Sequence, residues 1–119
     1  MDPQRKVLPL FIAAVSVATT LAFAACGSSG NGVSQSDREK AVDEAGAAFR
    51  QVEASGQDLS AGPCISDSLP GLPDWVADVA HDPRQDVDDQ PQNQCARYRD
   101  GDAHHFVELA LDGQLIRAE

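Results

Sequence analysis

The sequence predicts an α+β domain in which one amphipathic helix packs on a small antiparallel sheet. Two observations carry this prediction: apolar residues recur at helical spacing over 37–54, and two Asp-Gly pairs divide the last 25 residues into strand-like runs. A lone helix and a lone sheet each leave an apolar face uncovered, so the simplest fold lays one across the other. A chain of 119 residues is long enough for one such domain and its leader, but not for two domains.

The expected helix covers residues 37–54. Ser36 and Glu39 have the S-x-x-E spacing of a capping box at its start. Gly56 supplies a stop just after its end. Between these signals, apolar residues follow one another at steps of three and four and form a single stripe, which consists of Val42, Ala45, Phe49 and Val52.

The next segment with a periodic pattern is DWVADVAH at 74–81. Trp75, Ala77 and Val79 alternate as they would in a strand, whereas the apolar residues taken together also fit a short helix. We favour a strand, because valine and tryptophan suit a pleated surface, and it would be the fourth strand of the sheet. Prolines and glycines break up the chain before this segment, and a polar loop follows it.

The end of the chain is predicted to form a three-stranded meander over 95–99, 103–111 and 114–118. The connections are Asp100-Gly101 and Asp112-Gly113, and Asp-Gly is favoured in two-residue type I′ turns. A two-residue second loop places Glu108 opposite Arg117, and it forms two apolar pairs, Leu109 with Ile116 and Ala110 with Leu115. Opposite-charge and apolar cross-strand pairs both stabilise a hairpin.

The first 26 residues have the organisation of an export signal. Arg5 and Lys6 precede the uncharged run 7–25, which ends in small residues and Cys26. The stretch Phe-Ala-Ala-Cys at 23–26 resembles a bacterial lipobox, with Phe in place of the usual Leu. This resemblance implies cleavage before Cys26 and a diacylglyceryl thioether on its sulfur, with fatty chains such as palmitate; the alternative is an uncleaved transmembrane anchor.

The resemblance to bacterial lipoproteins divides the chain into three parts. Residues 1–25 are the expected signal peptide, 26–35 the lipidated cysteine with a flexible tether, and 36–119 the single domain. The protein is then expected on the extracytoplasmic face of the cell membrane, held there by lipid. The excess of Arg over Lys is similar to that of actinobacterial proteins.

The part after the signal is strongly acidic. The whole chain has a net charge of −10, and removing the first 25 residues takes away two basic groups and one acid. Such a chain is repelled by phosphate groups, because nucleic-acid affinity depends on basic side chains. We therefore expect no nucleic-acid partner. The expected partners are the membrane, through Cys26, and another protein of the cell envelope.

Cys64 and Cys95 are the two cysteines left for the folded domain. Export places them in an oxidising compartment, so we expect a disulfide between them. In the chain-entropy model, closing a loop of about 32 residues contributes roughly 3.5 to 4 kcal/mol. A reactive dithiol is the alternative, but the sequence contains no C-x-x-C.

Three histidines are the candidates for a metal site. His81 ends the strand-like segment, and His104 and His105 begin the long C-terminal strand. Neighbouring strand residues point to opposite faces, so the candidate site uses one of this pair with His81 and an acid of the 82–89 loop. The acids of that loop do not match an EF-hand, which needs a glycine at its sixth position.

No sequence motif of an enzyme is present. G-x-S-x-G, P-loop, H-E-x-x-H and G-x-G-x-x-G patterns are all missing from the sequence. We expect a protein without enzymatic activity and without a cofactor, which serves as a binding or interaction module in the envelope. The alternative function is metal binding through His81, His104 or His105 and loop acids.

Overall fold

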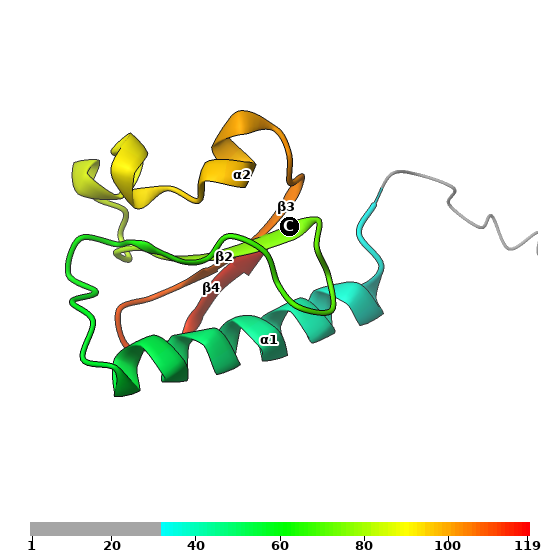
Figure 1. Ribbon diagram of the computed structural model, residues 1–119, viewed down its shortest axis with the longest axis horizontal. Helices are drawn as coiled ribbons and strands as arrows, with labels where there is room; N and C mark the ends of the chain where they lie inside the picture. Colours follow the sequence, from blue (N-terminus) through cyan, green and yellow to red (C-terminus); the bar gives the residue numbers. More distant parts are fainter. Residues whose placement is uncertain (1–31) are drawn as a thin grey trace, which may run out of the picture. The chain divides into compact units, whose positions relative to one another are not determined.

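The computed structural model describes residues 32–119, which form one α+β domain as predicted (Figure 1). The expected signal peptide, Cys26 and tether residues 27–31 lie outside the described residues. No helix within 32–119 is long and apolar enough to cross a bilayer. The elements follow in the order α1 (Gln35–Ala54), β1 (Cys64–Ser66), β2 (Trp75–Val79), the 3-10 turns η1 (Asp86–Asp89) and η2 (Pro91–Asn93), α2 (Ala96–Asp100), β3 (His105–Leu109) and β4 (Leu115–Ala118).

The long helix α1 confirms the predicted helix but begins two residues earlier. Ser34 is its N-cap, and the Ser34 hydroxyl accepts a hydrogen bond from the Asp37 amide at 3.0 Å. Ser36, predicted as the cap, lies inside the first turn, so the expected capping box with Glu39 is not formed. Val33, just before the cap, already packs against the core. The ordered domain therefore starts ahead of residue 36.

The sheet has four strands in the order β1-β2-β3-β4, and it is mixed where we expected it to be antiparallel. The predicted strand at 74–81 is confirmed as β2, but β2 and β3 run parallel. A parallel pair needs a crossover of a dozen or more residues. Residues 80–104 provide it, and they contain η1, η2 and α2.

The prediction of a first meander strand at 95–99 is wrong, because residues 96–100 form the short helix α2. Gly101 ends this helix with a left-handed backbone (φ 83°), and its amide donates to the Tyr98 carbonyl. The Asp100-Gly101 pair is thus a helix C-cap and not a hairpin turn. Glycine suits both roles because both need a positive φ, and the sequence signal is therefore ambiguous.

The second predicted hairpin exists as β3 and β4, and its Glu108–Arg117 pair is confirmed. The apolar pairs are wrong, since Leu109 lies opposite Leu115 and the register shifts between Glu108 and Leu109. The loop is one residue longer than expected. The Gly113 amide donates to the Ala110 carbonyl, and Gly113 is the one residue of this loop with a positive φ (85°). This geometry is typical of a three-residue loop with a bulge.

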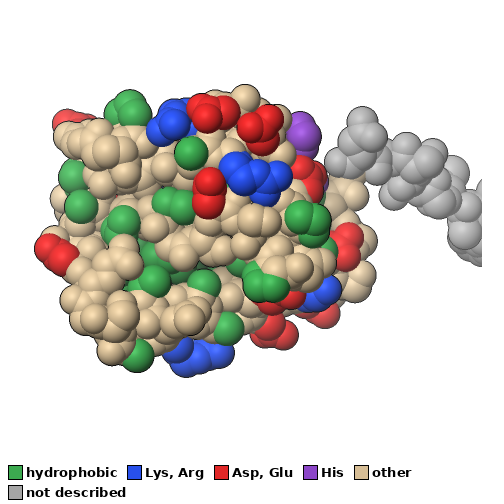
Figure 2. Space-filling view, viewed as in Figure 1, with side chains coloured by type: hydrophobic (Ala, Val, Ile, Leu, Met, Phe, Trp, Pro, Cys, Tyr) green, Lys and Arg blue, Asp and Glu red, His purple; other side chains and the backbone are tan. Residues whose placement is uncertain are grey.

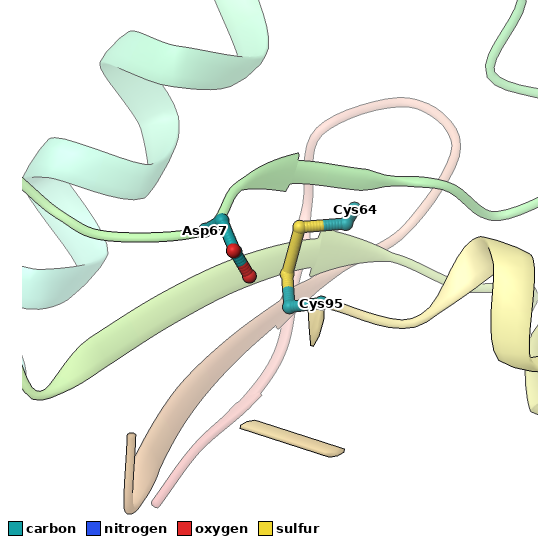
Figure 3. Close-up of side chains that lie close together, drawn as sticks. All are labelled: Cys64, Asp67 and Cys95. Atoms are coloured by element: carbon teal, nitrogen blue, oxygen red, sulfur yellow. A yellow bond between two sulfur atoms is a disulfide. The ribbon is translucent and has the colours of Figure 1, made fainter. Parts of the chain in front are cut away.

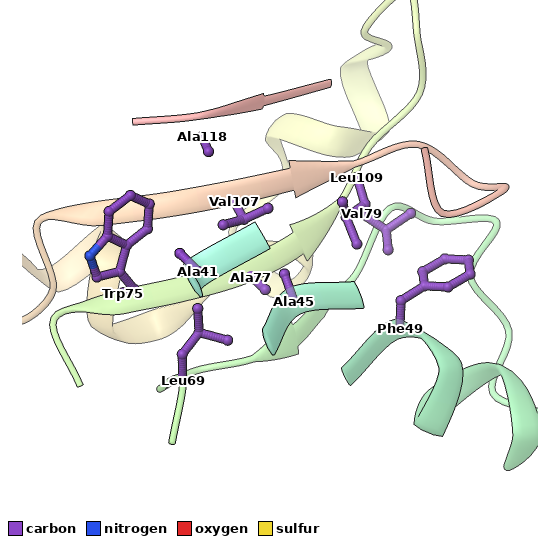
Figure 4. Packing of buried hydrophobic residues seen from close by; sticks show 10 residues of the cluster. All are labelled: Ala41, Ala45, Phe49, Leu69, Trp75, Ala77, Val79, Val107, Leu109 and Ala118. Atoms are coloured by element: carbon purple, nitrogen blue, oxygen red, sulfur yellow. The ribbon is translucent and has the colours of Figure 1, made fainter. Parts of the chain in front are cut away.

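The two faces of the sheet bury different cores. On one face α1 covers the larger cluster (Figure 4), which contains Ala41, Ala45, Phe49, Leu69, Trp75, Ala77, Val79, Val107, Leu109 and Ala118. The other face lies toward α2 (Figure 1) and buries only Val76, Cys95 and Ala103, with Cys64 and Phe106 partly buried beside them. The α2 side is therefore the thinly covered side of the sheet.

Candidate functional site

The predicted disulfide between Cys64 and Cys95 is confirmed and joins β1 to the start of α2. Asp67 lies next to it (Figure 3), and one ligand atom from each of these three residues falls within 4.8 Å of the others. Both sulfur atoms are already bonded to each other, so neither is a thiolate that could bind a metal. Asp67 also accepts a hydrogen bond from the Arg97 amide at 3.0 Å. We interpret this group as structural.

His81 is held by Asp88 at the carboxyl end of β2. The imidazole Nδ1 lies 2.9 Å from one carboxylate oxygen of Asp88. The other carboxylate oxygen accepts the backbone amides of His81 (3.1 Å) and Gln85 (2.8 Å). Burial raises the pKa of Asp88, but these hydrogen bonds outweigh it and leave the pKa below its ordinary value. The arrangement fixes the loop after β2.

His104 and His105 lie at the opposite end of the sheet, next to Asp74. His105 is the register partner of Trp75, and His81 follows Trp75 by six residues, or about 20 Å of extended chain. The structure therefore does not bring His81 together with the other two histidines, and the predicted combination is not formed.

Both histidines of the neighbouring pair approach the same carboxylate. The His104 Nδ1 atom is 2.8 Å from one oxygen of Asp74, and the His105 Nε2 atom is 3.6 Å from the other. His104 precedes the strand, so the alternation of strand side chains does not separate the two rings. The hydrogen bond from His104 holds the pKa of Asp74 below its ordinary value. Within 32–119, only the cysteine group brings three metal-ligating atoms within 4.8 Å.

The sheet face toward α2 carries a pocket of about 370 Å³, which we call the α2 pocket. It is lined by both charged and apolar side chains. Basic and acidic side chains lie beside one another on the α2 side of the molecule (Figure 2). The volume of the α2 pocket is within the range of small-molecule sites. The pocket is lined by Val76, Asp78, Arg84, Gln94, Cys95, Tyr98, Arg99, Phe106, Glu108 and Arg117.

The two acids of the pocket are neighbours on adjacent strands. Asp78 of β2 is the register partner of Glu108 of β3. Side chains alternate between faces along a strand, so residues 75, 77 and 79 point to α1 while residues 76 and 78 point to the α2 pocket. Both acids are thus placed at the centre of a sheet, where charged groups are rare.

Glu108 is buried but well paired. Its Oε2 atom accepts a hydrogen bond from Arg84 Nη1 at 2.6 Å, and Arg117 Nη2 lies 3.6 Å away. Arg84 is itself held in place by Asp89, whose carboxylate accepts from Nε at 2.8 Å. The two guanidinium groups supply the pairing that a buried carboxylate requires.

Asp78 has no comparable support. Its Oδ1 atom is buried and lacks a hydrogen-bond partner among the described residues. Burial, and then repulsion from Glu108, raise the pKa of Asp78 to about 7, although Arg84 and Arg117 oppose this shift. The carboxyl group is therefore protonated much more readily than an exposed aspartate, and its buried oxygen makes no hydrogen bond to the described residues.

Two aromatic residues, Tyr98 and Phe106, line the α2 pocket, and we call them its aromatic wall. The rings of Tyr98 and Phe106 meet edge to face, with centroids 5.1 Å apart. The guanidinium of Arg117 lies 4.9 Å above the Phe106 ring, at cation–π distance. Tyr98 is 44% exposed, although it belongs to a short helix tied down by the disulfide. An exposed aromatic ring that lines a pocket is available for contact with a ligand.

From the sequence, Glu108 is expected only as the cross-strand partner of Arg117, and no role is expected for Asp78. One signal was available: an acid stands at an inner position of each of two strand-like runs, in WVADV and in HFVEL. The parallel pairing that brings these acids together could not be read from spacing, because the segment between them was interpreted as a loop and a strand.

Comparisons with known proteins return no match. No protein-family model fits the chain, and searches of curated proteins and of solved structures find no significant similarity. Any functional conclusion therefore depends on the residues of this chain.

Proposed function

We propose that this protein is a lipid-anchored binding module on the extracytoplasmic face of the membrane and that it binds its ligand in the α2 pocket. The anchor part of the proposal is supported by the uncharged run 7–25 and the lipobox-like residues 23–26. A disulfide-bonded domain fits an oxidising compartment. The proposal includes no enzymatic step.

One observation carries the binding part of the proposal. Asp78 has a buried carboxyl oxygen without a hydrogen-bond partner, while Glu108 beside it is paired with two arginines. Leaving a buried polar group unsatisfied costs about 1–3 kcal/mol. Asp78 also lines the α2 pocket, and a ligand that places a hydrogen-bond donor against its carboxyl group would lower this cost on binding.

The anchor is tested by mass spectrometry of the N-terminal peptide from protein expressed in a bacterium with a lipoprotein pathway. We expect the chain to begin at Cys26 with a lipid adduct, and a Cys26→Ser variant to lose the adduct and leave the membrane fraction. An unmodified Cys26, or a leader still attached, would contradict the anchor.

Binding is tested by native mass spectrometry of the full chain in lipid nanodiscs against four compound classes: neutral sugars, amino acids, organic amines and organic acids. We expect one class to bind wild-type protein and to bind Asp78→Ala protein at least tenfold more weakly. The control is Asp43→Ala, which removes an exposed acid of α1 on the other side of the sheet. If no class binds, the binding proposal fails.

Metal binding is a second candidate, favoured by the approach of His104 and His105 to the one carboxylate of Asp74. It is tested by adding zinc, copper and calcium and following thermal unfolding, because a ligand specific for the folded state must raise stability. A rise that a His104→Ala variant abolishes and a His81→Ala variant keeps would support this site. No rise at millimolar metal would exclude it.

A further inference from the structure

We propose that the α2 pocket binds a single ring of a neutral carbohydrate, whose hydroxyl groups contact Asp78 and Arg117 and whose apolar face packs on Tyr98. This inference rests on the proposed binding function and adds the chemical class of the ligand. It follows from three features of the pocket: its balance of charge, its free hydrogen-bonding groups and its aromatic wall.

The charges of the pocket disfavour a ligand with a net charge. The pocket is lined by two acids, Asp78 and Glu108, and by three arginines, Arg84, Arg99 and Arg117. An anion would meet the two acids, and a cation would meet the arginines, so either ion is repelled by part of the lining. A neutral ligand avoids both costs.

The free hydrogen-bonding groups of the pocket are of both kinds. Asp78 lines the pocket and is only partly buried, so its carboxyl group presents an acceptor to a ligand there. Arg117 is 47% exposed, and its contacts are one 3.6 Å ion pair and the face of Phe106, so donors of its guanidinium remain available. A hydroxyl group donates and accepts through a single oxygen atom. One sugar hydroxyl can therefore satisfy Asp78 and Arg117 at once, and a ring carries several such groups.

The aromatic wall suits the other surface of a sugar. Tyr98 is half exposed at the edge of the pocket and is braced by Phe106. The C–H groups of a sugar ring form an apolar face, and a tyrosine ring supplies a flat apolar surface with a polar tip. A linear polyol has the hydroxyl groups but not the flat face. The wall thus favours a ring.

The test uses the full chain in lipid nanodiscs and saturation-transfer NMR with defined sugars. The probes are glucose, galactose, mannose, arabinose and N-acetylglucosamine, with glucuronate and glucosamine as charged analogues and sorbitol as a linear one. We expect at least one neutral ring to bind, at least tenfold more tightly than its charged or linear analogue. Asp78→Ala and Tyr98→Ala should each weaken binding tenfold or more, and Asp43→Ala should not change it.

The outcomes separate this inference from the proposed function. If no neutral ring binds but amino acids, amines or organic acids bind in a way that depends on Asp78, the carbohydrate inference is overturned and the binding proposal stands. If a neutral sugar binds equally well to all variants, the sugar lies elsewhere and the inference is also overturned. Melting temperatures no lower than that of the wild type exclude loss of fold, and Tyr98→Ala removes only a half-exposed side chain.

Discussion

Asp78 on β2 and Glu108 on β3 face the same pocket as register partners in the parallel part of the sheet. Only Glu108 has arginines within ion-pair distance, whereas one oxygen of Asp78 is buried without a partner. Burial, and then repulsion from Glu108, raise the pKa of Asp78 to about 7.

Asp78→Asn is expected to stabilise the domain in a manner that depends on pH. The folded state raises the pKa of Asp78 from 3.8 to about 7, so it binds the proton more tightly than the unfolded chain does. Stability from this group is complete below pH 4 and is lost as the pH rises to about 7. The amide cannot ionise, so we expect a gain of about 2–4 kcal/mol at pH 8 and almost none at pH 4, measured by urea unfolding.

The control for this experiment is Asp43→Asn on the outer face of α1, where the side chain is exposed. It changes the net charge equally but should leave stability almost unchanged at both pH values. The charged neighbours that set the Asp78 pKa are Glu108, Arg84, Arg117 and Asp88, and they remain in both variants. A gain from Asp78→Asn that is equal at pH 4 and pH 8 would show that a change in packing, not in charge, is responsible.

Replacing Cys64 and Cys95 together by serine is expected to lower the free energy of unfolding by about 3–4 kcal/mol. The two residues are 31 apart in sequence, and the bridge removes the corresponding loop entropy from the unfolded chain. Urea unfolding of the oxidised wild type and of the double variant gives the difference. A reducing agent should bring the wild type to the level of the variant and leave the variant unchanged; equal stability of all three would contradict the prediction.

The fold class was predictable because its signals are local. The apolar stripe of α1 and the pair Glu108–Arg117 both follow from spacing along short segments. Ala45 and Phe49 of the stripe are buried in the core, and the Glu108–Arg117 pair is formed. The disulfide needed only the count of cysteines and the expected compartment. The parallel β2–β3 pair depends on where a 25-residue crossover returns, and no local pattern encodes that.

The pocket was not predictable for the same reason. Gly101 can end a helix or form the turn of a hairpin, and the sequence signal does not distinguish the two. A hairpin is predicted, so residues 95–99 are expected to be a strand, and the face of the sheet toward α2 and Tyr98 is not predicted. The sequence predicts the three histidines as candidate metal ligands, but His81 and the pair at 104–105 are separated by the length of β2. The acids that do meet, Asp78 and Glu108, lie 30 residues apart on strands whose pairing was unknown.

Asp88→Ala is expected to destabilise the domain by about 2–4 kcal/mol at pH 7. The Asp88 carboxylate accepts from two backbone amides and contacts the His81 ring, and alanine would leave the amides of His81 and Gln85 without that acceptor. The folded state lowers the pKa of Asp88 below 3.8, so this stabilisation is present above pH 4 and is lost as the pH falls further. Thermal unfolding at several pH values measures it.

The matched control for that loop is Asp86→Ala, two residues earlier. Asp86 is exposed, whereas Asp88 is 2% exposed. The control removes the same charge from the same turn and should cost less than about 0.5 kcal/mol. Equal losses in the two variants would mean that the negative charge of the loop, and not the hydrogen bonds of Asp88, stabilises it.

The ion pair between Arg84 and Glu108 is expected to show strong coupling in a double-mutant cycle. The hydrogen bond between them is 2.6 Å, and the Glu108 side chain is 5% exposed. Arg84→Ala alone leaves a buried carboxylate with only the more distant Arg117, so we expect a loss of about 3 kcal/mol. Glu108→Gln removes the charge that needed pairing, so adding Arg84→Ala to it should cost much less, with a coupling energy of about 1.5–3 kcal/mol.

The exposed pair Arg99–Asp100 provides the comparison for this cycle. Its nitrogen–oxygen distance is 3.2 Å, but both side chains are more than one third exposed, at 39% and 56%. Water screens such a pair, so its coupling energy should lie below about 1 kcal/mol and fall further in 1 M salt. The coupling of Arg84 with Glu108 should persist in salt, because Glu108 is shielded from solvent. If both pairs gave the same small coupling, Glu108 would not be held by Arg84 in solution, and the contrast between the two acids of the α2 pocket would be lost.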